Sequence, residues 1–128
     1  MKIPYEEICL LQKYWAFFIP PESRVVSIED TREINLPREN WLPSVARTSI
    51  GLGKVGEIDL FEILKSSFRQ NPDYLIVGEV RGKEAFVLFQ GMASGHASLS
   101  TMHADSVDTL IRRLKTPPIS LSPTLINS

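Results

Sequence analysis

Carboxylate or imidazole side chains follow each of three short stretches whose residue patterns are typical of strands. They belong to Glu29 and Asp30, to Glu79, and to His103 with Asp105. A carboxylate in such a position can hold Mg²⁺ through water or take a proton from an attacking water, and an imidazole can hydrogen-bond to a nucleotide. Each residue alone has another explanation, since acidic residues at strand ends are often solvated or cap the next helix. Three such positions together favour one shared site.

Glu79 is the most specific of these candidates. An apolar run followed by a carboxylate is the Walker B arrangement, which serves Mg²⁺ or polarises the attacking water in phosphoryl transfer. Arg81 follows two residues later, and its guanidinium either pairs with a sheet carboxylate or reaches a phosphate. Glu29 or Asp30 could supply a second carboxylate that acts as general base on water.

His96 and His103 flank the third of these stretches, residues 97–101, where both could lie near its ends. A zinc site built from these two imidazoles and Asp105 has few ligands, so a hydrogen-bonding or nucleotide-sensing role is the better interpretation. The single cysteine, Cys9, excludes an internal disulfide. We interpret it as a small buried apolar residue, with a catalytic thiol as the alternative.

Alternating strand and helix patterns predict the elements that position these residues. Strands are predicted over 24–28, 74–77 and 97–101, and helices over 60–68 with Asp59 as N-cap, over 83–92 with Gly95 as C-cap, and from an Asp105 cap to Leu114. The helix over 83–92 should bury Ala85, Phe86, Leu88 and Phe89. Residues 31–56 are predicted to be irregular with one short strand. The pattern indicates an α/β fold whose partial parallel sheet is flanked by helices, with ligands beyond the carboxyl ends of the strands.

The composition is that of an ordinary globular domain. The 128 residues include 14 Lys and Arg against 15 Asp and Glu, with 43% hydrophobic residues, which excludes intrinsic disorder and a coiled coil. Without a basic excess, nothing argues for a nucleic-acid partner. The apolar run over 15–19 ends at Pro20, well short of the roughly 20 residues of a spanning helix. With no leader pattern, we expect a cytoplasmic chain.

A glycine-rich stretch, Gly51-Leu52-Gly53-Lys54, is not a phosphate-binding loop. Such a loop reads G-x-x-x-x-G-K followed by Ser or Thr. Here Val55 follows the lysine and the first glycine is missing. No other segment offers a phosphate cradle.

Four blocks of sequence resemble the hexameric secretion ATPases of type II secretion, type IV pili and the archaellum, the archaeal members most of all. Residues 27–33 resemble the Asp box of that family, 69–81 its Walker B segment and 95–106 its His box. Residues 34–41 are similar to a loop that follows the Asp box in archaeal members. The resemblance extends over about residues 18–126.

The resemblance implies a RecA-like P-loop NTPase core that uses ATP and Mg²⁺ to drive protein secretion or filament assembly. By this resemblance Glu29 is the catalytic glutamate that activates water, and Glu79 is the Walker B glutamate that serves Mg²⁺ indirectly. Other matched residues would sense nucleotide or phosphate, some across a subunit interface: His96, His103, Arg32, Arg47, Arg69 and Arg81.

The chain departs from the family pattern because residues 1–13 lack the Walker A loop and the sequence stops at Ser128. We therefore expect a divergent helix or remnant over 1–17 and a partial ATPase domain over 18–128. Such a fragment or truncated paralogue would bind ATP weakly and be inactive alone.

The alternative is a non-catalytic interaction module that associates with intact ATPase subunits. The partners implied by the resemblance are further copies in a hexamer and a membrane-embedded platform protein of a secretion or pilus machine. Through that partner the chain would lie at the inner face of the membrane.

Overall fold

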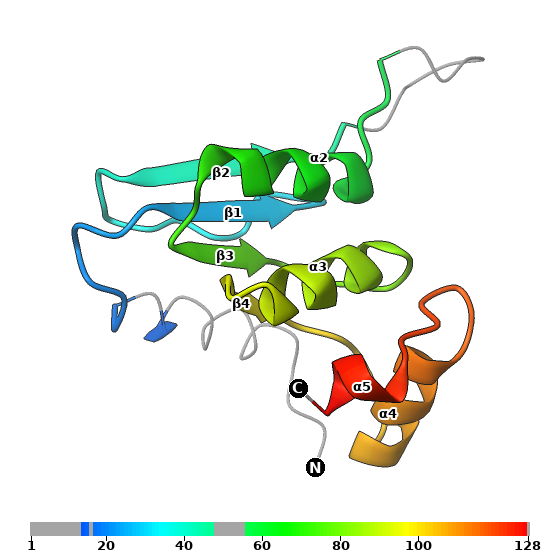
Figure 1. The fold of residues 1–128 in the computed structure, drawn as a ribbon. Coiled ribbons are helices and arrows are strands. Elements are labelled where there is room, and N and C mark those ends of the chain that lie inside the picture. Colours follow the sequence, from blue (N-terminus) through cyan, green and yellow to red (C-terminus); the bar gives the residue numbers. More distant parts are fainter. Residues whose placement is uncertain (1–13, 16, 48–55, 128) are drawn as a thin grey trace.

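The computed structural model describes residues 14–15, 17–47 and 56–127, and its centre is a four-stranded sheet (Figure 1). The strands are β1 (Val25–Glu29), β2 (Trp41–Val45), β3 (Tyr74–Val77) and β4 (Ala97–Ser100), in the spatial order β2-β1-β3-β4. All three strand pairs are parallel. The strands therefore begin along one side of the sheet, here called the amino edge, and end along the other, the carboxyl edge.

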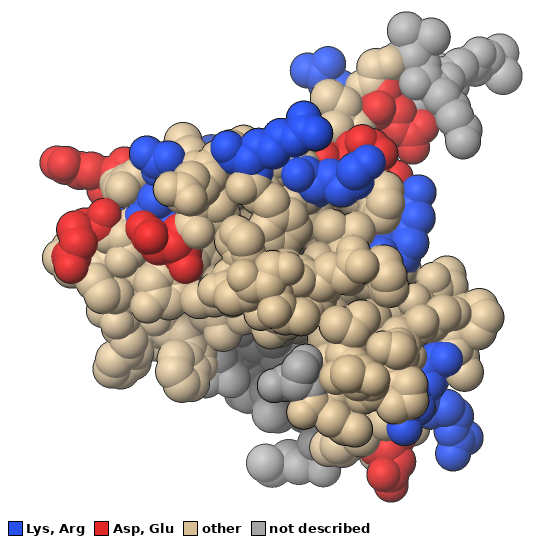
Figure 2. All heavy atoms as spheres, viewed as in Figure 1, with Lys and Arg blue, Asp and Glu red and all other residues tan. Residues whose placement is uncertain are grey.

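Helices lie over one face of this sheet and beyond its carboxyl edge. They are α2 (Leu60–Ser67), which continues into the 3₁₀ helix η1 (Phe68–Gln70), α3 (Glu84–Ala93), α4 (Val107–Lys115) and α5 (Pro123–Ile126). Figure 1 shows α2 and α3 lying over the strands, with α4 and α5 beyond the carboxyl edge. In the same view, charged side chains lie mainly around the margin and the middle is largely uncharged (Figure 2).

The two faces of the sheet bury different clusters because side chains alternate along a strand. On the helical face, Val26 and Ile28 of β1 and Leu75 and Val77 of β3 form one buried cluster with residues of the helices. The opposite face is covered by irregular chain. There Val25 and Ile76 are buried with Ile19, Ile34 and Leu36.

The alternation also decides where Glu29 points. Val25, Ser27 and Glu29 occupy alternate positions of β1, so all three belong to the face that the irregular chain covers. Trp41 Nε1 donates a hydrogen bond of 2.8 Å to the buried Ser27 Oγ. The Glu29 carboxyl group thus lies next to the chain segment that leaves β1.

Most of the predicted elements are confirmed. The strand over 74–77 is found as predicted, and the short strand expected within 31–56 is β2. Asp59 caps α2 by accepting the Glu62 N–H at 2.9 Å. The C-cap of α3 is Ser94 rather than the predicted Gly95, which follows it with a φ of 95°, a left-handed conformation that glycine adopts at low cost.

Two local predictions are wrong. Ser106, rather than Asp105, caps α4, because its extended backbone places Oγ where it accepts the Thr109 N–H at 3.1 Å. Phe86 is 36% exposed although it was expected on the buried side of α3. It follows the buried Ala85, and successive helix residues point about 100° apart, so the two side chains face different directions.

Some predictions fall on residues that the structure does not describe. These are the helical pattern over 1–13, Cys9 and the glycine-rich stretch 51–54. Of the predicted N-terminal helix, the described residues Tyr14 and Trp15 are helical. Within the described part of the chain, no helix has the length and apolar character needed to cross a membrane.

Candidate active site at the carboxyl edge of the sheet

Glu29, the last residue of β1, has an unusual environment for a carboxylate. It is 4% exposed. Its Oε1 accepts the backbone N–H groups of Glu33 and Ile34, each at 3.0 Å. Its Oε2 is buried and has no hydrogen-bond partner. An oriented carboxylate with one free oxygen is suited to take a proton from water.

The charge state of Glu29 is set by opposing effects. Burial raises the pKa of the Glu29 carboxyl group, because the charged form loses its hydration. The two backbone N–H donors lower the pKa in part, and so does the positive charge of Arg32. The net result is a carboxyl group whose pKa lies above its ordinary value, which makes it a stronger base than a surface glutamate.

Gly78, directly after β3, allows the chain to approach Glu29 closely. The Gly78 N–H donates to the Ile28 carbonyl at 2.8 Å. A Cβ atom at position 78 would lie 3.3 Å from the Glu29 Cγ. A glycine at this point therefore brings the end of β3, and Glu79 with it, against the end of β1.

Glu79 lies at the centre of a charged cluster. Arg81 Nη2 is 3.0 Å from Glu79 Oε2 and 3.6 Å from Asp30 Oδ2. His103 Nε2 is 3.7 Å from Glu79 Oε1. The segments that follow β1, β3 and β4 thus meet around one carboxylate, as the parallel arrangement of the predicted strands implies.

The partners of Glu79 are held loosely. The side chains of Arg81 and His103 are 64% and 54% exposed, whereas that of Glu79 is 13% exposed. Because the guanidinium and the imidazole face solvent, a ligand can reach them and compete with Glu79 for these contacts. Carboxylate oxygens suit Mg²⁺, directly or through water, and the guanidinium and imidazole suit phosphate oxygens.

The other predicted site residues are spread more widely. Arg32 follows β1, and its guanidinium carbon lies 5.2 Å from the centre of the Trp41 ring. Arg47 lies just beyond the end of β2, where its backbone pairs with Ile58 through hydrogen bonds of 2.9 and 3.0 Å. Both arginines are exposed on loops of the carboxyl edge.

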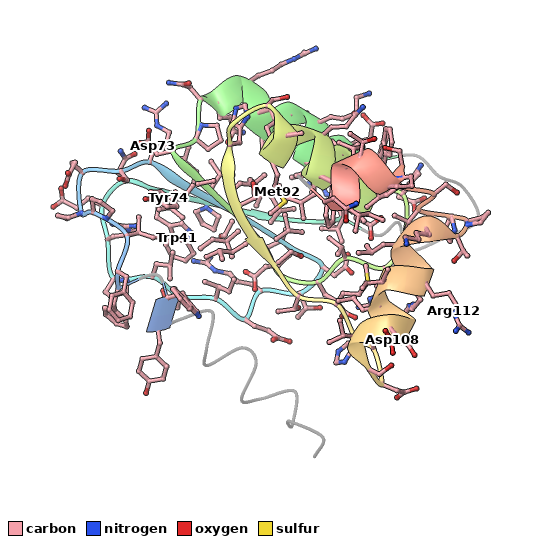
Figure 3. The ribbon with its side chains drawn as sticks, turned by 60° about the horizontal axis from the view of Figure 1, so that its bottom comes forward. Trp41, Asp73, Tyr74, Met92, Asp108 and Arg112 are labelled. Atoms are coloured by element: carbon pink, nitrogen blue, oxygen red, sulfur yellow. The ribbon has the colours of Figure 1, made fainter. Side chains whose placement is uncertain are left out.

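Two predicted site residues lie at the amino edge instead. Arg69 is in η1, which precedes β3, and His96 immediately precedes β4. The His96 ring packs edge-on against Phe68 with ring centres 5.0 Å apart, and its Nδ1 lies 3.2 Å from the Gly91 carbonyl oxygen. In Figure 3 the labelled residues Trp41 and Tyr74 mark the amino edge of the sheet, and α4 lies at its other end.

The placement of β4 therefore separates the two histidines. His96 comes before the strand and His103 after it, so they lie at opposite edges of the sheet. The structure does not bring them to one site, and this removes the geometry that a zinc site with both imidazoles and Asp105 requires. Among the described residues there is no group of three or more side chains that could hold a metal.

The sequence argument missed two residues that hold the site together. Thr101 donates its hydroxyl hydrogen to the Gly78 carbonyl. Arg113 of α4 donates a hydrogen bond to the His103 carbonyl. Thr101 lies in the block that resembles the His box. That resemblance indicates that the segment is part of the site, but it does not indicate what Thr101 does there. Nothing in the pattern of α4 singles out Arg113.

A four-stranded parallel sheet flanked by helices defines the chain as an α/β protein with a RecA-like fold. More specifically, the chain belongs to the type II/IV secretion system protein family, whose model matches residues 9–126. The match covers the whole described sheet and every predicted site residue.

Individual relatives agree with this assignment. An uncharacterized protein of Methanocaldococcus jannaschii is 50% identical over 107 residues, which are 84% of this chain and 39% of that protein. The type IV secretion system protein PtlH of Bordetella pertussis is 39% identical over 98 residues, 75% of this chain and 29% of PtlH. The chain thus spans less than half the length of these relatives.

Solved structures show the same fold. The VirB11 ATPase from the Brucella suis type IV secretion system, crystallised in complex with sulphate, matches 94% of this chain and 34% of its own at 26% identity and a TM-score of 0.71. The Legionella pneumophila ATPase DotB matches 96% of this chain and 33% of its own, with a TM-score of 0.67. At 19% identity, DotB supports the fold alone.

Proposed function

We propose that this chain forms the hydrolytic edge of the ATP site in a secretion-system motor ATPase. The observation that carries the proposal is the convergence of Glu29, Glu79 and His103 at the carboxyl edge. This is where parallel α/β sheets bind their ligands. The family match supports a secretion machine, and the proposal includes machines that assemble a pilus or archaellum filament.

Glu29 acts as the general base in this proposal. Its Oε1 is held by two backbone N–H groups, which fix the carboxylate, while Oε2 remains free to accept a proton. The raised pKa keeps that oxygen basic enough to take the proton of a water that attacks phosphorus. The surrounding apolar residues limit competing solvent.

Glu79 serves Mg²⁺ through water, and Arg81 and His103 respond to phosphate. When bound, the metal neutralises charge that develops on the phosphate oxygens. Arg81 and His103 then exchange their contacts with Glu79 for contacts with phosphate, which the exposure of both side chains allows.

The remaining predicted residues take different places in this proposal. Arg32 and Arg47, on exposed carboxyl-edge loops, suit contacts to phosphate or to the nucleotide of a neighbouring subunit. Arg69, exposed at the amino edge, suits a contact with a neighbouring subunit. His96 can influence the site only through the fold, since its ring is engaged by Phe68 and Gly91.

The residues present fit the hydrolytic side of an ATP site better than its phosphate-binding side. Residues 1–128 contain no G-x-x-x-x-G-K-[ST] segment, and such a loop provides much of the affinity for phosphate. We therefore expect residues 18–128 to act as a partial ATPase domain that binds Mg-ATP weakly. Turnover requires a phosphate-binding loop supplied in addition.

The assembly in this proposal is a hexamer that docks on a membrane-embedded platform protein. Such a protein would work at the cytoplasmic face of the membrane.

Thermal unfolding with increasing Mg-ATP tests the proposed site. A ligand at ten times its Kd stabilises the folded state by about 1.4 kcal/mol, which raises the unfolding midpoint. We expect a rise for the wild-type chain and for Glu39→Gln, a control on an exposed loop, and a smaller rise for Glu79→Gln. No rise at 10 mM Mg-ATP, or an equal rise in Glu79→Gln, would contradict the proposal.

A second candidate function is a non-catalytic module that binds intact ATPase subunits. Its support is a group of exposed aromatic side chains before β1, of which Phe17 and Phe18 are 66% and 81% exposed. Exposed apolar groups of this kind often mark protein contacts. Co-purification with a full-length relative that persists in Glu79→Gln and is lost in Phe18→Ser would favour this candidate, and failure to associate would remove it.

A further inference from the structure

The segments that follow β3 and β4 are joined by hydrogen bonds around Glu79. The Thr101 hydroxyl donates to the Gly78 carbonyl, and the Val80 N–H donates to the Thr101 carbonyl at 2.9 Å. On the other side, the Gly78 N–H donates to the Ile28 carbonyl at 2.8 Å. The peptide group before Glu79 is therefore bonded to the Thr101 hydroxyl, and the one after it to the Thr101 main-chain carbonyl.

Packing also holds these segments, since Val80 is buried in the core cluster of the helical face and Met102 packs against that cluster. An apolar pocket of about 200 Å³ lies beside them, and Val80, Thr101 and Met102 form one of its walls. Its remaining lining comes from β4, α3 and α4, including Ser100, Leu88, Phe89, Met92, Leu110 and Leu114. The Thr101 hydroxyl adds to this packing a directional contact that fixes the Gly78 carbonyl.

The position of Thr101 connects two candidate site residues. Glu79 lies between the two residues that Thr101 bonds, and His103 is on the same segment as Thr101. The 3.7 Å between His103 Nε2 and Glu79 Oε1 depends on how these two segments lie against each other. At its far end, the His103 carbonyl accepts a hydrogen bond from Arg113, which ties the segment to α4.

We infer that Thr101 is a positioning residue whose hydroxyl sets the placement of Glu79 relative to His103. Its consequence for ATP rests on the proposed function, because only then do the two side chains meet the same ligand. The positioning itself can be measured without nucleotide.

Amide hydrogen exchange on residues 1–128 tests the inference. Thr101→Val keeps the shape of the side chain and removes the hydroxyl, whereas Thr101→Ser keeps the hydroxyl. In Thr101→Val the bond of the Val80 amide to the main-chain carbonyl of residue 101 is kept, but the hydroxyl no longer holds the neighbouring Gly78 carbonyl. We expect the segment to open more often, so that the Val80 amide exchanges about tenfold faster, a factor of the size that the loss of one hydrogen bond implies. In Thr101→Ser we expect the wild-type rate. Ser98→Ala is the matched control, since the Ser98 hydroxyl bonds only locally, to the His96 carbonyl at 3.2 Å.

The pattern of exchange separates positioning from general stability. If Thr101 merely stabilises the fold, the β3 amides of Leu75 and Ile76 will speed up by the same factor as Val80. That result, or a Val80 rate within twofold of wild type in Thr101→Val, would overturn the inference. If Mg-ATP does not raise the unfolding midpoint of the wild-type chain, the proposed function is contradicted. The exchange rates would still decide whether Thr101 is a positioning residue. If both hold, Thr101→Val should also weaken Mg-ATP binding while Thr101→Ser does not.

Discussion

The amino edge of the sheet ties its polar side chains into the fold, whereas the carboxyl edge leaves them loosely paired. At the amino edge, Asp73 Oδ2 accepts the Arg24 N–H at 2.7 Å, and Arg24 Nη1 donates to the Gln70 carbonyl at 2.9 Å. His96 there contacts both Phe68 and Gly91. At the carboxyl edge, Glu29 keeps a buried oxygen without a partner, and the ion-pair partners of Glu79 are exposed.

This difference separates two uses of the same residue types. Hydrogen bonds that are complete and packed contribute to the stability of the fold. An unpaired buried polar group costs stability, and an exchangeable ion pair adds little to it. Both kinds of group are found mainly where a protein binds a ligand. His96 and His103 show the contrast within one segment of chain, so residue type alone does not indicate which of them acts in the site.

The largest expected effect is at the amino edge, in Gly91→Ala. The new Cβ would lie 2.2 Å from Phe68 Cζ, so the ring or α3 has to move. Overpacking of this kind costs about 1–3 kcal/mol, which urea unfolding would measure. Gln90→Ala, an exposed neighbour on α3, is the control and should change stability by less than about 0.5 kcal/mol. Equal stability of both variants would contradict this account of the amino edge.

Removal of the imidazole ring should lower stability more at His96 and weaken the response to Mg-ATP more at His103. His96→Ala loses an aromatic contact and a hydrogen bond and should lower the free energy of unfolding by about 1–2 kcal/mol. His103→Ala, at an exposed position, should change it by less than about 0.5 kcal/mol. The response of the unfolding midpoint to Mg-ATP should show the reverse order. A larger stability loss in His103→Ala would remove the distinction between the edges.

Glu29→Gln should stabilise the chain at neutral pH by about 1 kcal/mol, because it removes a buried charge with an unpaired oxygen. The raised pKa of Glu29 means that protonation favours the folded state. The stabilisation that this protonation provides is fully present below the pKa of Glu29 in the unfolded chain. It is lost as the pH rises through the higher pKa of Glu29 in the folded chain. The advantage of Glu29→Gln in urea unfolding should therefore shrink between pH 7 and pH 4. An advantage that is constant over this range would contradict the assigned cause.

The smallest effects are expected for the arginines. Arg81→Ala and Arg69→Ala should each change stability by less than about 0.5 kcal/mol, since both side chains are exposed. Only Arg81→Ala should reduce the rise of the unfolding midpoint with Mg-ATP. If Arg69→Ala reduces this rise equally, the amino edge also takes part in nucleotide binding.

Much of the fold was predictable because local signals agreed. The continuous apolar run Tyr74–Val77 predicts a buried parallel strand, and Asp59 before an apolar helical pattern predicts a helix start. Parallel strands then require their carboxyl ends to meet, which predicts the grouping of Asp30, Glu79 and His103. These inferences depend on residue types and strand direction, both of which the sequence contains.

The details that failed depend on how the chain is placed in space. The edge at which His96 lies follows from where β4 begins, and the pattern of the segment did not determine that. The role of Thr101 depends on the neighbouring segment after β3. The cap of α4 moved from Asp105 to Ser106 through the backbone conformation of one residue, which composition does not determine.

The central claim is that the carboxyl edge binds nucleotide and the amino edge does not. Titration of Mg-ATP into the isotope-labelled chain, followed by amide NMR shifts, tests it directly even for binding in the millimolar range. We expect saturable shifts at Gly78–Arg81, at Thr101–His103 and after β1, with Arg69, Asp73 and His96 unchanged. Shifts concentrated at the amino edge, or none at either edge, would contradict the claim.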